Sequence, residues 1–350
     1  MNYPNSITKM LNIEFPLIQA PMFGVTTPEM VSAAAKANAL GSLALADLEA
    51  EKCLDLIQST KKLTDKNFAV NIFVHDIPPI TDELKNQYAS AKKFIEDLAE
   101  QHHLDVKLSD FNEIKVQSYH EQLEIIIAEN CKILSFTFGN LDPQSIDLLK
   151  SKGITLIGTC TSLNEALILE KSGIDIICVQ GIEAGGHRGS FKSENIPQIG
   201  GLSLLSQVKN LVKVPLIYAG GIYNAQTMSA AETLGAEGFQ IGSLLLGSSE
   251  SALKKFEKER LRTLNEEDII LTNSFSGRYA RGIKNIFTET MKQTPHILPY
   301  PYQNKLTNEL RRAAKAHENT DFVSIWVGQS INEYRPQSVT EIMRDLIAES

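Results

Sequence analysis

The sequence has few cysteines and no arrangement in which they could act together. Its 350 residues include four, all widely spaced, so no pair has the CxxC spacing of a zinc or redox site. Four thiols in a chain of this length also do not make a disulfide framework. We interpret Cys53, Cys131, Cys160 and Cys178 as buried free thiols of a protein from a reducing compartment.

Positive charge is also in deficit: the chain has 34 lysines and arginines against 42 acidic residues, a net charge of −8. Nucleic acids and anionic membranes favour basic surfaces, so this balance argues against both as partners. No apolar run approaches the roughly 18 residues of a membrane-spanning helix, and the N-terminus lacks a signal-peptide pattern. We expect a cytoplasmic protein that binds a small molecule, as a monomer or a homodimer.

Two ligand motifs are missing. The dinucleotide fingerprint GxGxxG would follow the first strand of a doubly wound sheet, but residues 19–24 read QAPMFG. Metal sites need histidine, cysteine or carboxylate side chains at regular spacing, and His102, His103 and His120 lie without such partners. We therefore expect neither a Rossmann-type dinucleotide site nor a metal site.

The chain does contain a series of short apolar runs, each closed by glycine or a polar turn and followed by a helical pattern. The predicted strands are residues 16–20, 41–46, 68–74, 132–138, 154–158, 174–180, 215–219 and 238–241. Their near-continuous hydrophobicity is typical of parallel strands covered on both faces. Eight such units predict a (β/α)8 TIM barrel, and a doubly wound open sheet is the alternative.

Two regions do not follow this repeat. Residues 76–111 are polar and helix-prone, which predicts a helical insertion after the third strand that acts as a lid. Residues 253–350 form a helical C-terminal extension, which we expect to pack on the barrel. The barrel itself is then expected to comprise residues 1–75 and 112–252.

The segment 180–189 (QGIEAGGHRG) directly follows the sixth predicted strand. Its glycines, Gly185 among them, let the backbone approach a flat or charged ligand. Because barrels bind ligands at the carboxyl ends of their strands, we predict a functional loop with His187 as the catalytic residue. A solvated surface turn is the alternative.

Glycines also follow the seventh and eighth predicted strands. Gly220 and Gly221 come after one, and residues 240–243 (QIGS) after the other. Loops at these places in many barrels hold a phosphate through backbone N–H groups, and the Ser243 hydroxyl adds a donor. Together, these two loops predict a phosphate site, although either loop alone would be interpreted as a tight turn.

Amide side chains at strand ends indicate that the ligand also has an aromatic ring. Gln19, Asn71 and Gln180 can each donate to and accept from the edge of a heteroaromatic ring. Met22 and Phe23, beside Gly24, can wall such a ring, although core packing is their commoner use. An aromatic cofactor with a phosphate tail and a histidine near its face indicates FMN.

These segments resemble the motifs of nitronate monooxygenases, formerly called 2-nitropropane dioxygenases, of the bacterial class I type. The resemblance spans about residues 11–328, and its most specific part is EAGGHRG. The motifs are residues 19–22 (QAPM), 71–74 (NIFV), 180–189, 219–222 (AGGI), 240–243, 274–282 (SFSGRYARG) and 300–304 (YPYQN). One departure is Thr137, where some relatives carry histidine.

The resemblance implies an FMN-containing barrel that oxidises alkyl nitronates, such as propionate 3-nitronate, with O₂ to a carbonyl compound and nitrite. His187 matches the family's active-site histidine, as a base toward the neutral nitroalkane or as a donor to the nitronate oxygens. The cofactor residues it implies are Met22, Phe23 and Gly24 along the flavin, Asn71 and Gln180 as hydrogen-bonding partners, Gly185 and Gly221 through their backbone, and Gln240, Ile241, Gly242 and Ser243 at the phosphate.

Three further residues are assigned to the substrate. Arg188 adds positive potential, and Tyr300 and Tyr302 close the pocket. The alternatives are a structural bond of Arg188 to its own loop, and packing of the tyrosines between extension and barrel.

Two other functions are compatible with the same residues. Flavin-dependent enoyl-acyl carrier protein reductases, which use NAD(P)H, resemble this chain in the AGGH loop and the ARG segment but differ in the opening motif. A non-catalytic flavin-binding barrel is the other, because a fold does not determine a function.

Overall fold

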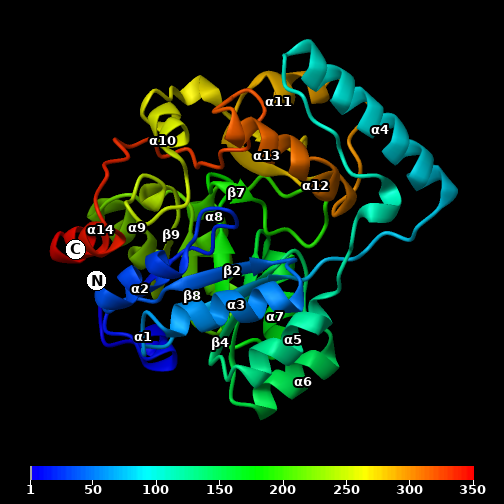
Figure 1. Cartoon of the computed structure of the whole chain (residues 1–350). Coiled ribbons are helices and arrows are strands. Elements are labelled where there is room, and N and C mark those ends of the chain that lie inside the picture. The colour runs from blue at the N-terminus through cyan, green and yellow to red at the C-terminus, as the bar shows by residue number, and fades with distance from the viewer. Residues whose placement is uncertain (1) are drawn as a thin grey trace.

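The computed structural model describes residues 2–350, and its centre is a barrel of eight parallel strands (Figure 1). Its strands are β1 (Leu17–Gln19), β2 (Ser42–Ala46), β3 (Ala69–Phe73), β4 (Ile133–Thr137), β5 (Thr155–Cys160), β6 (Ile176–Gln180), β8 (Leu216–Ala219) and β9 (Gly238–Ile241). They pair in the order β1-β9-β8-β6-β5-β4-β3-β2.

The barrel closes between β1 and Leu40, which lies two residues before β2. The Leu40 N–H donates to Leu17 O, and the Gln19 N–H donates to Leu40 O, both at 2.9 Å. Each predicted strand is present and the ring closes, so the TIM-barrel prediction is confirmed and the open sheet is excluded.

The amino-terminal end of the barrel is filled by a short helix, α1 (Ser6–Leu11). Its Ile7 and Leu11 are fully buried and pack in one cluster with the first residues of three strands, Ala69, Ile133 and Ile176. Burial of this apolar surface stabilises the barrel. The carboxyl ends of the strands are left as the end at which a ligand can enter.

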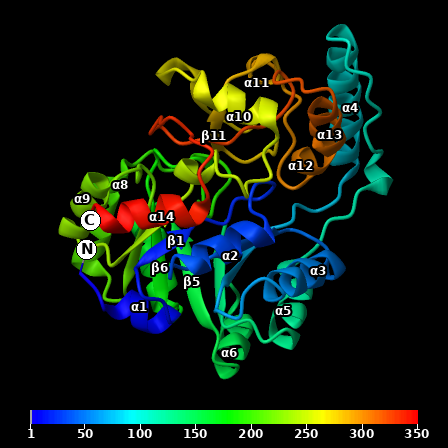
Figure 2. The ribbon, with the colours of Figure 1, turned by 60° about the vertical axis from the view of Figure 1, so that its left-hand side comes forward.

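Eight helices surround the barrel, and the last of them comes from the end of the chain. The outer helices are α2 (Pro28–Lys36), α3 (Ala50–Lys61), α5 (Tyr119–Ala128), α6 (Pro143–Ser151), α7 (Leu163–Lys171), α8 (Gly201–Leu211), α9 (Ala225–Thr233) and α14 (Val339–Ala348). Helix α14 lies beside α2 (Figure 2), where Thr340 Oγ1 donates to Ala33 O at 2.7 Å. Two of these helices begin at a hydroxyl cap, since Thr27 accepts from Met30 N and Ser162 accepts from Glu165 N.

The insertion after β3 contains α4 (Asp82–Gln101) and the short helix η1 (Phe111–Glu113). Figure 1 shows α4 beside α12 (Tyr302–Leu306) and α13 (Asn308–Ala316) of the extension rather than against the barrel. The Phe111 ring stacks on Tyr302 with centroids 5.7 Å apart, and the Tyr302 hydroxyl donates to Pro78 O at 2.9 Å. The insertion is therefore tied to the extension.

The C-terminal extension is helical, as predicted, but it also contributes two strands. Its helices are α10 (Lys255–Arg262), α11 (Ile286–Met291), α12 (Tyr302–Leu306) and α13 (Asn308–Ala316), with short helices η2 (Ser243–Leu245) and η3 (Glu266–Asp268) before and between them. The strands β10 (Ile269–Thr272) and β11 (Ala280–Ile283) form an antiparallel sheet with β7 (Gly186–His187). β7 belongs to the glycine-rich loop, so the extension holds the backbone of that loop.

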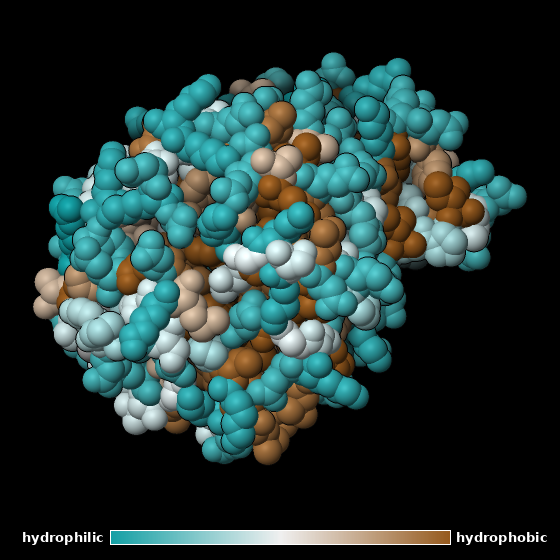
Figure 3. Space-filling model, turned by 90° about the horizontal axis from the view of Figure 1, so that it is seen from below, coloured by the Kyte–Doolittle hydropathy of each residue, from teal (hydrophilic) through white to brown (hydrophobic). Residues whose placement is uncertain are grey.

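The predicted division at residues 75, 111 and 252 stays a prediction, and α14 packs in the helix ring although that division places it outside the barrel. Within residues 2–350, no helix is both long and apolar enough to cross a membrane. Seen from below, hydrophilic side chains cover most of the surface and apolar side chains appear in patches (Figure 3).

Candidate active site

A cavity of about 450 Å³ lies at the carboxyl ends of the barrel strands. Phe73, Thr137 and Gln180 are the last residues of β3, β4 and β6, and all three line it. The extension covers the cavity from above with Tyr300 and Trp326. The cavity therefore lies between the barrel and the extension, where the barrel fold places ligands.

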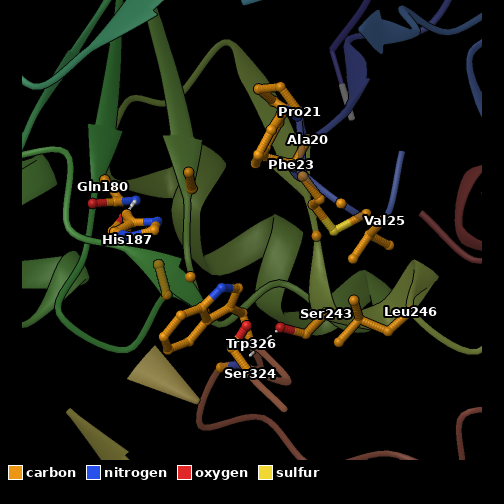
Figure 4. A pocket seen from close by; sticks show the side chains of 18 of the residues that line it. Ala20, Pro21, Phe23, Val25, Gln180, His187, Ser243, Leu246, Ser324 and Trp326 are labelled. Atoms are coloured by element: carbon orange, nitrogen blue, oxygen red, sulfur yellow. Dashed lines mark hydrogen bonds between the residues drawn. The ribbon is translucent and has the colours of Figure 1, made fainter. Parts of the chain in front are cut away.

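Most of the predicted site residues meet in this one cavity. Those that line it are Met22, Phe23, Gly24, Asn71, Gln180, Gly185, His187, Gly220, Gly221, Gln240, Gly242, Ser243 and Tyr300. In Figure 4, Gln180 and His187 lie on one side, Pro21, Phe23 and Val25 on another, and Ser243 and Trp326 along a third. The fold thus brings together residues up to 278 positions apart, from Met22 to Tyr300, although their roles stay predictions.

Four predicted residues lie outside the cavity lining. Gln19 is fully buried, and its Oε1 accepts from Ser42 N at 3.0 Å instead of facing a ligand. Ile241 is fully buried in the apolar core. The Arg188 guanidinium, also buried, donates to the backbone carbonyls of Gly181 and Gln180. Tyr302 is buried and bonded to the insertion. Arg188 therefore makes the structural bond to its own loop that the sequence analysis kept as the alternative, whereas the contacts of Tyr302 are with the insertion and not between extension and barrel.

Glycines shape the wall of the cavity because side chains would not fit there. A Cβ on Gly185 would lie 2.5 Å from Gly328 N and 2.7 Å from Val327 C, both backbone atoms. Gly220 and Gly221 have φ of +116° and +70°, which side chains rarely allow. The Ser243 hydroxyl lies at the same place and accepts from Gly328 N at 2.8 Å.

The two amides at strand ends are already bonded within the protein. Gln180 Nε2 donates to His187 O at 3.1 Å, and its Oε1 accepts from Gly189 N at 2.8 Å. Asn71 Nδ2 donates to Ser135 Oγ at 2.9 Å. Gln180 thus holds the ends of the His187 loop, and each amide keeps further donor or acceptor capacity.

His187 lies in an aromatic environment next to cationic side chains. Its ring is 5.5 Å from Trp326 and 5.6 Å from Phe138, between ring centroids, and its Nε2 lies 2.8 Å from Ser276 Oγ. Burial, with repulsion from Arg278 and Arg311 and a smaller opposing effect of Asp47, lowers the pKa of His187 to about 3. The imidazole is therefore neutral at physiological pH.

Glu183 is a cavity residue that the sequence analysis did not single out. Its carboxylate accepts from the Tyr218 hydroxyl at 2.5 Å and from the Gly201 N–H at 3.0 Å. It thereby connects the loop after β6 with β8 and with the start of α8. It belongs to the quoted EAGGHRG motif, but its partners are visible only in three dimensions.

The extension adds a polar face that sequence reasoning also missed. The side chains on α12 and α13 that line the cavity are Asn304, Asn308, Arg311, Arg312 and Lys315. They recur at helical spacing, which is the signal that could have revealed them. Arg311 Nη2 donates to Asn304 Oδ1 at 2.9 Å, and Lys315 pairs with Glu257 at 3.2 Å.

A sequence model of nitronate monooxygenases matches residues 5–349. The chain belongs to the nitronate monooxygenase family. A probable nitronate monooxygenase from Staphylococcus haemolyticus is 37% identical, over 99% of this chain and 97% of its own length. The family that the motifs predicted is therefore confirmed, and the chain is an oxidoreductase.

Two solved structures resemble the fold. A nitroalkane oxidase from Streptomyces ansochromogenes superposes with a TM-score of 0.89 at 29% identity, covering 99% of this chain and 97% of that one. FabK from Thermotoga maritima gives 0.76 at 24% identity, covering 99% and 96%. The second similarity concerns the fold alone. The family and the first neighbour both indicate the oxidation of nitronates or nitroalkanes.

Proposed function

We propose that this enzyme binds FMN in the cavity and oxidises alkyl nitronates, such as propionate 3-nitronate, with O₂ to a carbonyl compound and nitrite. The observation that carries the proposal is the convergence of three glycine-bearing strand ends and His187 on one cavity. The family membership of the chain supports the reaction.

The residues present fit a flavin mononucleotide. A cavity of about 450 Å³ is within the size range of small-molecule sites. Gly220, Gly221 and Ser243 provide backbone and hydroxyl donors for the phosphate, and the wall at Met22 to Gly24 is suited to a flat ring. We propose the predicted cavity-lining residues as its binding site; when bound, FMN supplies the electron acceptor for the substrate.

The surroundings of His187 suit an anionic or acidic nitro compound. Arg278 and Arg311 provide positive potential near the imidazole, which attracts a nitronate. Phe73, Tyr300 and Trp326 line the cavity and limit the access of water. Low local polarity strengthens electrostatic attraction within the site.

The test uses the purified protein. We expect the visible absorption of an oxidised flavin, release of FMN on denaturation, and nitrite formation from propionate 3-nitronate in air. A parallel assay follows NADPH oxidation with crotonyl thioester. Reduction of the flavin by NADPH under argon, without nitrite from the nitronate, would assign the chain to the enoyl reductases instead. A colourless protein that does not take up FMN would exclude the cofactor.

A further inference from the structure

Three polar groups meet at the buried hydroxyl of Ser276. Its Oγ lies 2.8 Å from His187 Nε2, 2.9 Å from Arg278 O and 3.3 Å from Arg278 N. Ser276 is 1% exposed and Arg278 is 5% exposed, so water does not compete for these bonds. Each group must therefore find its partner inside the protein.

The inventory of donors decides the direction of these bonds. The Arg278 carbonyl can only accept, and we find no other donor to it among residues 2–350. The Ser276 hydroxyl has one proton and two lone pairs. It donates that proton to Arg278 O and accepts from Arg278 N, which leaves one lone pair. Only a proton on His187 Nε2 can complete the arrangement, because a bare Nε2 would face an acceptor.

We propose that Ser276 is the positioning residue that fixes His187 as the Nε2–H tautomer and leaves Nδ1 as the free proton acceptor of the site. Nδ1 has no hydrogen-bonding partner within residues 2–350, and the ring lines the cavity (Figure 4). The opposite direction would leave the Arg278 carbonyl buried and unsatisfied, an arrangement that folded proteins avoid.

This tautomer decides between the two roles that the sequence left open for His187. A neutral imidazole whose Nε2–H is bonded to Ser276 has no proton to donate to a nitronate oxygen. Its Nδ1 can take the α-proton of a neutral nitroalkane: the N–H bond forms, the C–H bond breaks, and the C–H electron pair becomes the nitronate. The imidazolium is then paired with that anion. The inference rests on the proposed function and concerns the removal of the proton from neutral nitroalkanes.

The direct test is nitrogen NMR of the purified enzyme labelled with ¹⁵N-histidine, with His187→Asn used to assign the His187 signals. We expect a protonated Nε2 and an unprotonated Nδ1. Ser276→Ala should shift both signals toward the average of two tautomers, and Ser276→Thr should restore them. A protonated Nδ1 in the wild-type enzyme would overturn the proposal, and this readout does not depend on turnover.

The kinetic test compares nitroethane with ethyl nitronate. Ser276→Ala should lower kcat/KM for nitroethane about tenfold or more, because proton transfer loses its oriented base, while ethyl nitronate stays within about twofold. Ser274→Ala is the matched control, because Ser274 is buried and hydrogen-bonded to Thr272 but does not contact His187. An unchanged ratio of the two substrates in Ser276→Ala would contradict the proposal. Failure of the wild-type enzyme on ethyl nitronate would contradict the proposed function instead.

Discussion

The chemistry of His187 depends on its surroundings as much as on its own ring. Burial and two neighbouring guanidinium groups keep the imidazole neutral, and a serine from the extension contacts its Nε2. An exposed histidine would change its charge near neutral pH. The same residue type in a loop without these neighbours would not have this role.

Replacing His187 by asparagine should leave FMN bound but reduce nitrite release from nitroethane by on the order of 10²-fold, the usual scale for a proton-transfer group. Flavin absorbance and a nitrite assay with nitroethane measure the two effects separately. Turnover equal to that of the wild-type enzyme would remove the histidine from the mechanism.

A second histidine, His75, gives a pH dependence of stability. Burial, with repulsion from Arg278 and Lys305 against an opposing effect of Asp47, lowers the pKa of His75 from 6.5 to about 4. As the pH falls below 6.5, the unfolded chain therefore takes up a proton that the folded protein refuses. The free energy of unfolding should fall by about 2 kcal/mol from this group between pH 7 and pH 5.

Urea denaturation at the two pH values measures this effect. His75→Asn should lose that part of the pH dependence, and the exposed His103→Asn should keep all of it. An equal pH dependence in His75→Asn and the wild-type protein would show that His75 does not contribute.

At the scale of elements, the strand ends and their loops make the site, and the helices hold them in place. The loops after β6, β8 and β9 carry most of the glycines of the cavity wall, and Glu183 connects the loop after β6 to β8 and α8. The antiparallel pairing of β7 with β11 fixes the backbone of the His187 loop. These contacts make the loops rigid where a ligand must be held.

Gly185→Ala tests the close approach of the loop to the extension. The added Cβ would meet Gly328 N and Val327 C, so one of the two segments has to move. We expect FMN affinity to fall about tenfold or more and the melting temperature to fall, since backbone overpacking typically costs 1–3 kcal/mol. Fluorescence titration with FMN measures the affinity.

Gly200→Ala is the matched control, because a Cβ there meets nothing within 4 Å and the residue has no positive φ. It should bind FMN as the wild-type protein does. Unaltered FMN affinity in Gly185→Ala would show that the wall tolerates a methyl group at this place.

At the scale of the whole molecule, the chain leaves the barrel after β9 and returns to it as α14. The extension between them is therefore anchored at both ends, and it covers the cavity with Tyr300, Arg311 and Trp326. This anchoring keeps the upper wall of the site in place without a covalent link.

The single tryptophan of the chain, Trp326, reports on this arrangement. Because its indole lines the cavity, FMN bound there should quench most of its fluorescence. Adding FMN to protein freed of cofactor measures the quenching, and Trp326→Phe should abolish the emission. Emission that stays constant while FMN binds would place the flavin away from the extension.

Which parts of the fold the sequence could predict depends on how far apart along the chain the contacting residues lie. The eight strands follow from local composition, because a parallel strand buried on both faces must be apolar along its length. The glycine loops could be located because each follows directly on such a strand. In contrast, β10 and β11 are short and partly polar, and β11 pairs with residues about 90 positions away, so no local pattern indicates them.

Local patterns in the chain thus decided the barrel and the position of its glycine loops, and they singled out His187 as the candidate catalytic residue. Only the tertiary structure decided that Arg188 and Tyr302 serve the packing, that Glu183 and Trp326 join the cavity, and that Ser276 contacts His187. The physical reason is that burial and the direction of a hydrogen bond depend on groups that the fold, and not the order of residues, places side by side.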